Sequence, residues 1–88
     1  MKLVSIDPAT GEVFAEYPAA TLRDAAQAVE RAHEAFRGWR RSPWSERAAR
    51  MRAAAERLRA RREEYARLMA REMGKPVGQG RGEIDKCA

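Results

Sequence analysis

The sequence has few of the residues from which reactive sites are usually built. Its 88 residues include one cysteine, Cys87, one histidine, His33, and no asparagine. A single cysteine excludes an internal disulfide and gives no sign of an oxidising compartment, and one His with one Cys cannot form a zinc site. We expect Cys87 to be a buried structural thiol and His33 to be packed or partly exposed, since neither has a catalytic partner nearby in the sequence.

Long apolar runs are also absent. The opening segment, 1–8, is too short in apolar residues for a signal peptide or a membrane span, so we expect a cytoplasmic protein with no membrane partner. Aromatic residues make up only 7%, and much of the 44% hydrophobic content is alanine, which buries little area. A chain this short is marginal as an independent domain. We therefore expect it to complete its core against other sequence.

Positive charge, in contrast, is abundant, with 18 Lys and Arg against 13 Asp and Glu and a net charge of +5. Such a balance would suit a nucleic acid or an anionic surface. The arginines, however, alternate with alanine and glutamate, which is typical of a solvated helix face. We predict no nucleic-acid partner, and keep as the alternative a standalone basic helical module that binds nucleic acid or a protein partner, which salt-dependent binding would reveal.

Turn residues and apolar periodicity predict a β-hairpin followed by three to four α-helices. The hairpin covers 3–17, and its turn contains an Asp-Pro pair and a glycine that permits positive φ. The spacing of apolar residues predicts helices over about 21–37, 43–60, 62–73 and 77–88.

Capping preferences give the predicted ends of the first two helices. Thr21 is the expected N-cap of the first, with Asp24 three residues later in a box-like arrangement, and Gly38 is expected to end it. Ser42 is the expected cap of the second helix, with Pro43 at its first position.

Glycine sets the last predicted helix apart. Gly74 suits the position after a helix C-terminus, and the proline two residues later prevents continuation. Gly78, Gly80 and Gly82 follow, and each weakens a helix by about 1 kcal/mol relative to alanine. We therefore expect the helix at 77–88 to be weak.

Two glycine-containing segments resemble phosphate-binding loops without meeting their requirements. The segment 78–82 follows no strand, and Glu83 stands where the last glycine of a dinucleotide fingerprint belongs. Gly74-Lys75 lacks both the glycine five residues earlier and the Ser or Thr that should follow. We predict that neither segment binds a cofactor.

Two further clusters have a structural interpretation. Glu63 and Glu64 do not face each other on a helix, and we expect both to pair with arginines one turn away. Trp39 and Trp44 bracket the pair Arg40-Arg41, and aromatics among arginines can stack on bases. Because they flank a connection between helices, we expect the tryptophans to pin two helices together. No catalytic, cofactor-binding or metal residue is assigned.

Taken in order, these pieces resemble the start of the aldehyde dehydrogenase superfamily. The resemblance rests on 7–13, 35–36 with Trp39, 44–48, 58–64, 72–76 and 81–84. The motif Arg-Glu-Met-Gly-Lys-Pro at 71–76 is most similar to the corresponding motif of succinate-semialdehyde dehydrogenases. Members of this family usually have alanine and acidic residues after Gly-Lys-Pro, where this chain has glycines.

The resemblance implies a larger α/β parent, in which 1–88 is the N-terminal part of the Rossmann-like cofactor-binding domain. Such parents oxidise an aldehyde to a carboxylic acid with NAD or NADP, and are expected to be homo-oligomers. A cysteine thiolate, a glutamate-activated water and an oxyanion-holding asparagine do the chemistry. Cys87 does not lie in the family's nucleophile motif, so the segment alone is expected to be inactive and to bind no cofactor.

The resemblance also implies a partner and a possible ion. The partner is the remainder of the dehydrogenase chain, against which the helical stripes would pack. Some family members bind a monovalent cation near the residues that match Ser5, Ile6 and Glu83, but we assign no metal site to them.

Overall fold

The N-terminal residues form the predicted hairpin in the computed structural model, which describes all 88 residues. Strand β1, Lys2–Ile6, pairs antiparallel with β2, Val13–Pro18. In the turn, the Asp7 carboxylate accepts a hydrogen bond from the Ala9 N–H at 2.9 Å, and Gly11 has a φ of 76°. Both are the features for which Asp and Gly are favoured in turns, and the predicted hairpin is confirmed.

Helix α1 spans Leu22–Trp39 and begins with a complete capping box. The Asp24 N–H donates to Thr21 Oγ1 at 3.1 Å, and the Thr21 N–H donates to the Asp24 carboxylate at 2.9 Å. The predicted end at Gly38 is wrong, since the helix continues to Trp39. A glycine ends a helix where it takes positive φ, and Gly38 does not.

Three further helices follow: α2 at Trp44–Ala60, α3 at Arg62–Met73 and α4 at Val77–Cys87. The predicted cap of α2 is wrong by one position. Pro43 is the N-cap, with φ −66° and ψ 155°, and no side chain caps the helix. Its extended ψ places Pro43 outside the helix, so Ser42 lies one residue too far away to serve as the cap.

The last helix forms despite its three glycines. Gly80 and Ile84 are buried, on the side of α4 that faces α3. Packing of one helix face supplies most of the stability of helices in proteins, and it overrides intrinsic propensity. The expected weakness of this segment therefore does not prevent the helix in this structure.

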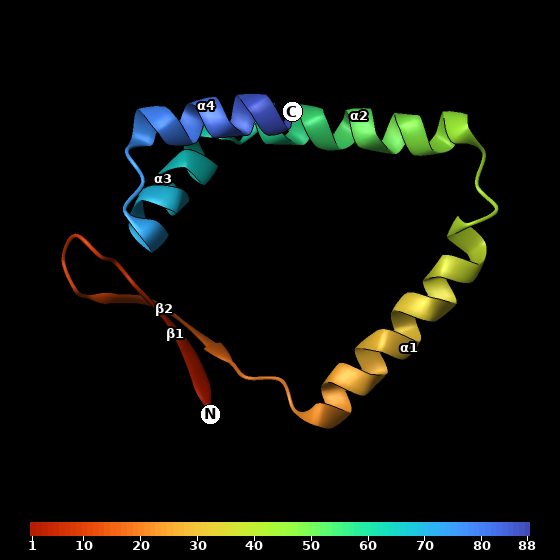
Figure 1. The fold of residues 1–88 in the computed structure, drawn as a ribbon, viewed down its shortest axis with the longest axis horizontal. Helices are drawn as coiled ribbons and strands as arrows, with labels where there is room; N and C mark the ends of the chain where they lie inside the picture. The colour runs from red at the N-terminus through yellow and green to blue at the C-terminus, as the bar shows by residue number, and fades with distance from the viewer.

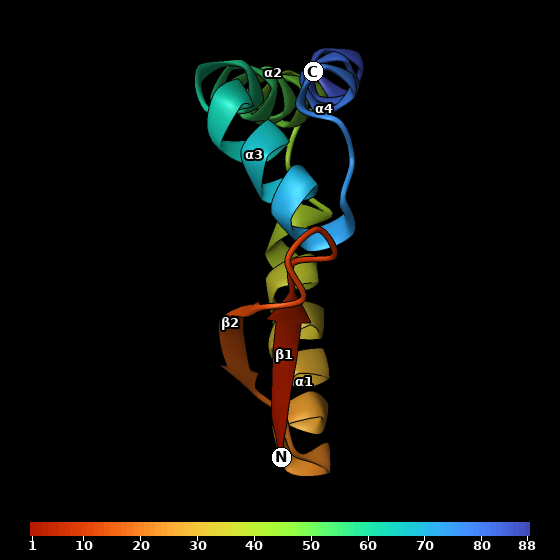
Figure 2. The same ribbon diagram turned by 90° about the vertical axis from the view of Figure 1, so that its left-hand side faces the viewer.

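The elements form an open, flat arch (Figure 1). Helix α3 packs against α4, α4 also lies along α2, and the hairpin touches α3, whereas the backbone of α1 approaches no other element. Seen edge-on, the arch is thin (Figure 2), with extents of 47 × 35 × 14 Å. Its radius of gyration is 17.3 Å, against roughly 12 Å for a compact domain of this length.

Very little of the chain is buried. Only three of the 88 residues are, namely Ala66, Gly80 and Ile84. The predicted apolar stripe of α1 is open to solvent, with Leu22 92%, Val29 69% and Phe36 52% exposed. These residues form no core of their own, which fits a chain whose apolar faces pack on other sequence.

Candidate functional site

The tightest contact in the structure is between α3 and α4, where two small residues meet. Ala66 is completely buried. A Cβ added to Gly80 would lie 3.2 Å from Ala66 Cα and 3.3 Å from both Ala66 Cβ and the carbonyl oxygen. Because two of these three atoms are backbone, they cannot move aside as a flexible side chain would. Gly80 therefore permits the close approach of the two helices.

Ion pairs flank this contact. Arg81 Nε on α4 donates to the Glu63 carboxylate at 2.6 Å, and Arg62 lies 3.4 Å from Asp85. The hydrogen bond from Arg81 holds the pKa of Glu63 below its ordinary value. All four side chains are at the surface, so each pair contributes modestly to stability.

The expectation for the adjacent glutamates is half confirmed. Glu64 pairs with Arg61 one turn away, at 2.8 Å and 2.6 Å, and this bond lowers the pKa of Glu64. Glu63 instead pairs across to Arg81 on the next helix. The packing of α4 on α3 brings that guanidinium nearer, and no spacing within one helix could have indicated it.

Gly74 ends α3 and lies against the turn of the hairpin. Its φ of 73° is left-handed, and its N–H donates to the Ala70 carbonyl at 2.9 Å, as predicted for a helix stop. A Cβ here would lie 3.1 Å from Pro8 Cγ in the hairpin turn. Nearby, the Arg71 guanidinium carbon lies 4.5 Å from the centroid of the Phe14 ring. The hairpin therefore packs against the C-terminal end of α3.

The glycine-rich segment does not fit a dinucleotide. A phosphate cradle needs free backbone N–H groups at the start of a helix that follows a strand. Here α4 follows α3 through a short connection capped by Pro76, and Gly80 is covered by Ala66. Lys75 is engaged by Glu83. The segment therefore lacks the preceding strand and the open glycine on which such a cradle depends.

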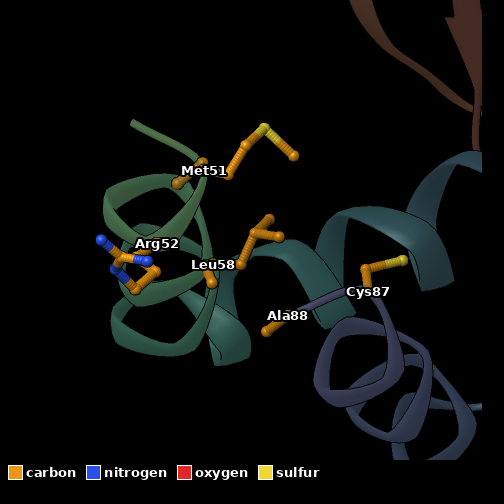
Figure 3. Close-up of a pocket in the computed structure, with 7 residues that line it drawn as sticks. Met51, Arg52, Leu58, Cys87 and Ala88 are labelled. Atoms are coloured by element: carbon orange, nitrogen blue, oxygen red, sulfur yellow. The ribbon is translucent and has the colours of Figure 1, made fainter. Parts of the chain in front are cut away.

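Cys87 and His33 are not brought together. Cys87 is exposed at the end of α4, so the prediction of a buried thiol is wrong. It borders a shallow apolar hollow of about 280 Å³ shared with Met51 and Leu58, and its sulfur points away from both (Figure 3). His33 is exposed on α1, whose backbone approaches no other element. The burial preference of cysteine presupposes a covering element, and none is present.

The structure also groups no metal ligands. No three His, Cys, Asp or Glu side chains lie close enough to hold an ion. Of the three residues that the resemblance associates with a cation in some family members, Ser5 and Ile6 lie on β1, which does not approach α4. Glu83 on α4 is paired with Lys75.

None of the four helices combines the length and the apolar composition that a membrane span requires.

The corner between α1 and α2 differs from the sequence prediction. Trp39 and Trp44 remain 43% and 82% exposed, and the backbones of the two helices stay apart. The tryptophans therefore join the two helices through a side chain that lies over both rings, and not through packing of one helix on the other. The side chain that occupies the corner is Arg47, whose guanidinium lies over both rings. Arg47 lies in the segment 44–48 that carries part of the family resemblance, but nothing in the sequence indicates that it contacts both tryptophans.

The sequence of this chain has counterparts among known proteins. The sequence model of the aldehyde dehydrogenase family matches residues 1–88. The chain belongs to the aldehyde dehydrogenase family. It is 44% identical over 85 residues to a succinate semialdehyde dehydrogenase [NAD(P)+] of Escherichia coli, a match that covers 97% of this chain and 18% of that protein.

Other members of the aldehyde dehydrogenase family match over the same range. An N-succinylglutamate 5-semialdehyde dehydrogenase of Caulobacter vibrioides is 42% identical, over 99% of this chain and 18% of its own length. A probable succinate-semialdehyde dehydrogenase [NADP(+)] of Synechocystis is 36% identical, over 100% of this chain and 19% of its own. The chain thus spans just under a fifth of the length of the curated relatives it matches.

Proposed function

We propose that this chain is the N-terminal scaffold segment of an NAD(P)-dependent aldehyde dehydrogenase. The observation that supports it most is the family match over all 88 residues of a chain with only three buried residues. A self-sufficient domain of this size would bury well over half of its surface. The apolar faces of α1 and α2 are instead exposed. We propose that they pack against the remainder of the dehydrogenase fold.

The proposed reaction of the whole enzyme is the oxidation of an aldehyde to a carboxylic acid, with succinate semialdehyde as the candidate substrate. Two of the relatives described above are named for succinate semialdehyde. The segment itself is proposed to take no part in the chemistry, since Cys87 is exposed on α4 and the one histidine, His33, lies on α1, which does not approach α4. The whole enzyme is further proposed to be a cytoplasmic homo-oligomer, with no nucleic-acid or membrane partner.

Turnover tests this proposal directly. The purified chain is incubated with succinate semialdehyde and NAD⁺ or NADP⁺, and reduced cofactor is followed by absorbance; none should form. The chain is then co-expressed with the Escherichia coli relative from which the matching segment has been removed. Activity that depends on both pieces supports a scaffold role. Turnover by the chain alone would refute it.

The alternative, a nucleic-acid-binding module, has its own measurement. Electrophoretic shift of duplex and single-stranded probes at low salt should be absent under the proposed function. Binding that weakens steeply as salt rises would favour the alternative instead.

A further inference from the structure

Among the exposed residues of α1 and the start of α2, one small region is packed. From residue 20 to residue 54, every side chain is exposed except Ser42, Arg47 and Ala48, which are half-buried. All three belong to the corner where α1 gives way to α2. It is unusual for a long cation to be among the least exposed side chains of a surface segment.

Arg47 is held there by the backbone of the corner. Its Nη2 donates to the carbonyl oxygens of Trp39 at 3.2 Å and Arg40 at 3.0 Å, and its Nε donates to the carbonyl of Ser42 at 3.2 Å. The carbonyls at the end of a helix have no partners within it. One guanidinium, reaching back from the first turn of α2, therefore gathers three carbonyls from the end of α1 and the connection.

The same guanidinium lies over two aromatic rings. Its central carbon lies 5.7 Å from the centroid of the Trp39 ring and 5.3 Å from that of Trp44, within the range of cation–π attraction. Arg47 has no carboxylate partner. The interactions of its guanidinium are therefore with the backbone carbonyls and the aromatic rings of the corner.

We infer that Arg47 is a positioning residue that fixes the direction of α1 relative to α2. Because the backbone of α1 approaches no other element, its direction depends on the connections at its two ends, and the corner where Arg47 meets Trp39 is the packed one. A planar guanidinium has donors at fixed angles, whereas a lysine ammonium is a point charge on a flexible stem. Lysine at this position would keep the positive charge but lose the fixed, planar arrangement of donors that reaches three carbonyls at once.

The test measures the direction of α1 by spin labelling. One label is attached to Cys87, which is exposed at the end of α4, and the other to Gln27→Cys on α1, an exposed position. Pulsed dipolar spectroscopy then gives the distribution of distances between α1 and the body formed by α2 and α4. The variants are Arg47→Met, Arg47→Lys and, as matched control, Arg50→Met, an exposed arginine one turn further along α2.

The parent and Arg50→Met should give the same narrow distribution, and both variants of Arg47 should broaden it by about twofold or more. Amide exchange supplies a second readout. The N–H groups of Arg41 and Ser42, bonded to Gly38 and Trp39, should exchange about tenfold faster in Arg47→Met, while Gly80 in α4 is unchanged.

Three results would overturn the inference. They are an equally broad distribution in the parent, an unchanged distribution in Arg47→Met and Arg47→Lys, or faster exchange at Gly80 as well as at the corner. The last would make Arg47 a determinant of general stability rather than of one angle. The inference does not depend on the proposed function, since neither readout involves activity.

Discussion

Replacing Gly80 by alanine separates the two effects that a glycine in a helix can have. In an open helix interior, Gly→Ala stabilises by about 1 kcal/mol, because alanine loses less backbone entropy on folding. At Gly80 the new Cβ would lie 3.2–3.3 Å from the backbone and Cβ of Ala66. Overpacking of this kind costs about 1–3 kcal/mol. We therefore expect Gly80→Ala to range from neutral to about 2 kcal/mol less stable.

Gly82 provides the matched control, because it lies in the same helix and a Cβ there meets no atom within 4 Å. Gly82→Ala should stabilise by about 1 kcal/mol. The free energy of unfolding is measured by urea denaturation followed by far-UV circular dichroism. The difference between the two variants, about 1–3 kcal/mol, is the cost of the contact. Equal stabilisation by both would refute the close approach of α3 and α4.

Three further outcomes are expected. Because Arg81 lowers the pKa of Glu63 in the folded chain, the ionised carboxylate stabilises the α3–α4 contact. This stabilisation is fully present at pH values above the pKa of Glu63 in the unfolded chain, about 4.3. Helical signal should therefore fall as the pH drops through the lower folded pKa, and less so in Glu63→Gln. Thr21→Ala should destabilise α1 by about 1 kcal/mol, seen as faster exchange of its first-turn amides. Gly74→Ala should be more disruptive than Gly11→Ala in urea denaturation, since both have positive φ but only the former meets a neighbouring atom.

Local chemistry was enough to predict the hairpin and most helix ends. The turn around Asp7 and Gly11, the capping box at Thr21 and the left-handed stop at Gly74 all depend on residues within a few positions of one another. Such signals are present in the sequence because the physics that creates them is local.

Features that depend on distant neighbours were not predictable in this way. The glycines of α4 indicated a weak helix, yet Gly80 is where the helix meets Ala66, fourteen positions earlier. Cys87 was expected to be buried, but burial needs a covering element. The pairing of Glu63 with Arg81 likewise follows from helix packing and not from spacing.

The central claim is that the apolar stripe of α1 packs against the rest of an aldehyde dehydrogenase fold. Val29 is 69% exposed on that stripe, and Gln27 lies on the opposite side of the same helix, about 160° away at 100° per residue. Burial of a valine side chain is worth roughly 1.5–3 kcal/mol, so its loss alone corresponds to about tenfold or more in affinity.

The most direct measurement is a titration of the truncated Escherichia coli relative with the 88-residue chain, with recovered aldehyde oxidation as the readout. Val29→Asp should raise the concentration needed for half-maximal activity at least tenfold, whereas Gln27→Asp should change it by less than about twofold. Equal recovery with both variants and the parent chain would contradict the packing of α1 against the enzyme.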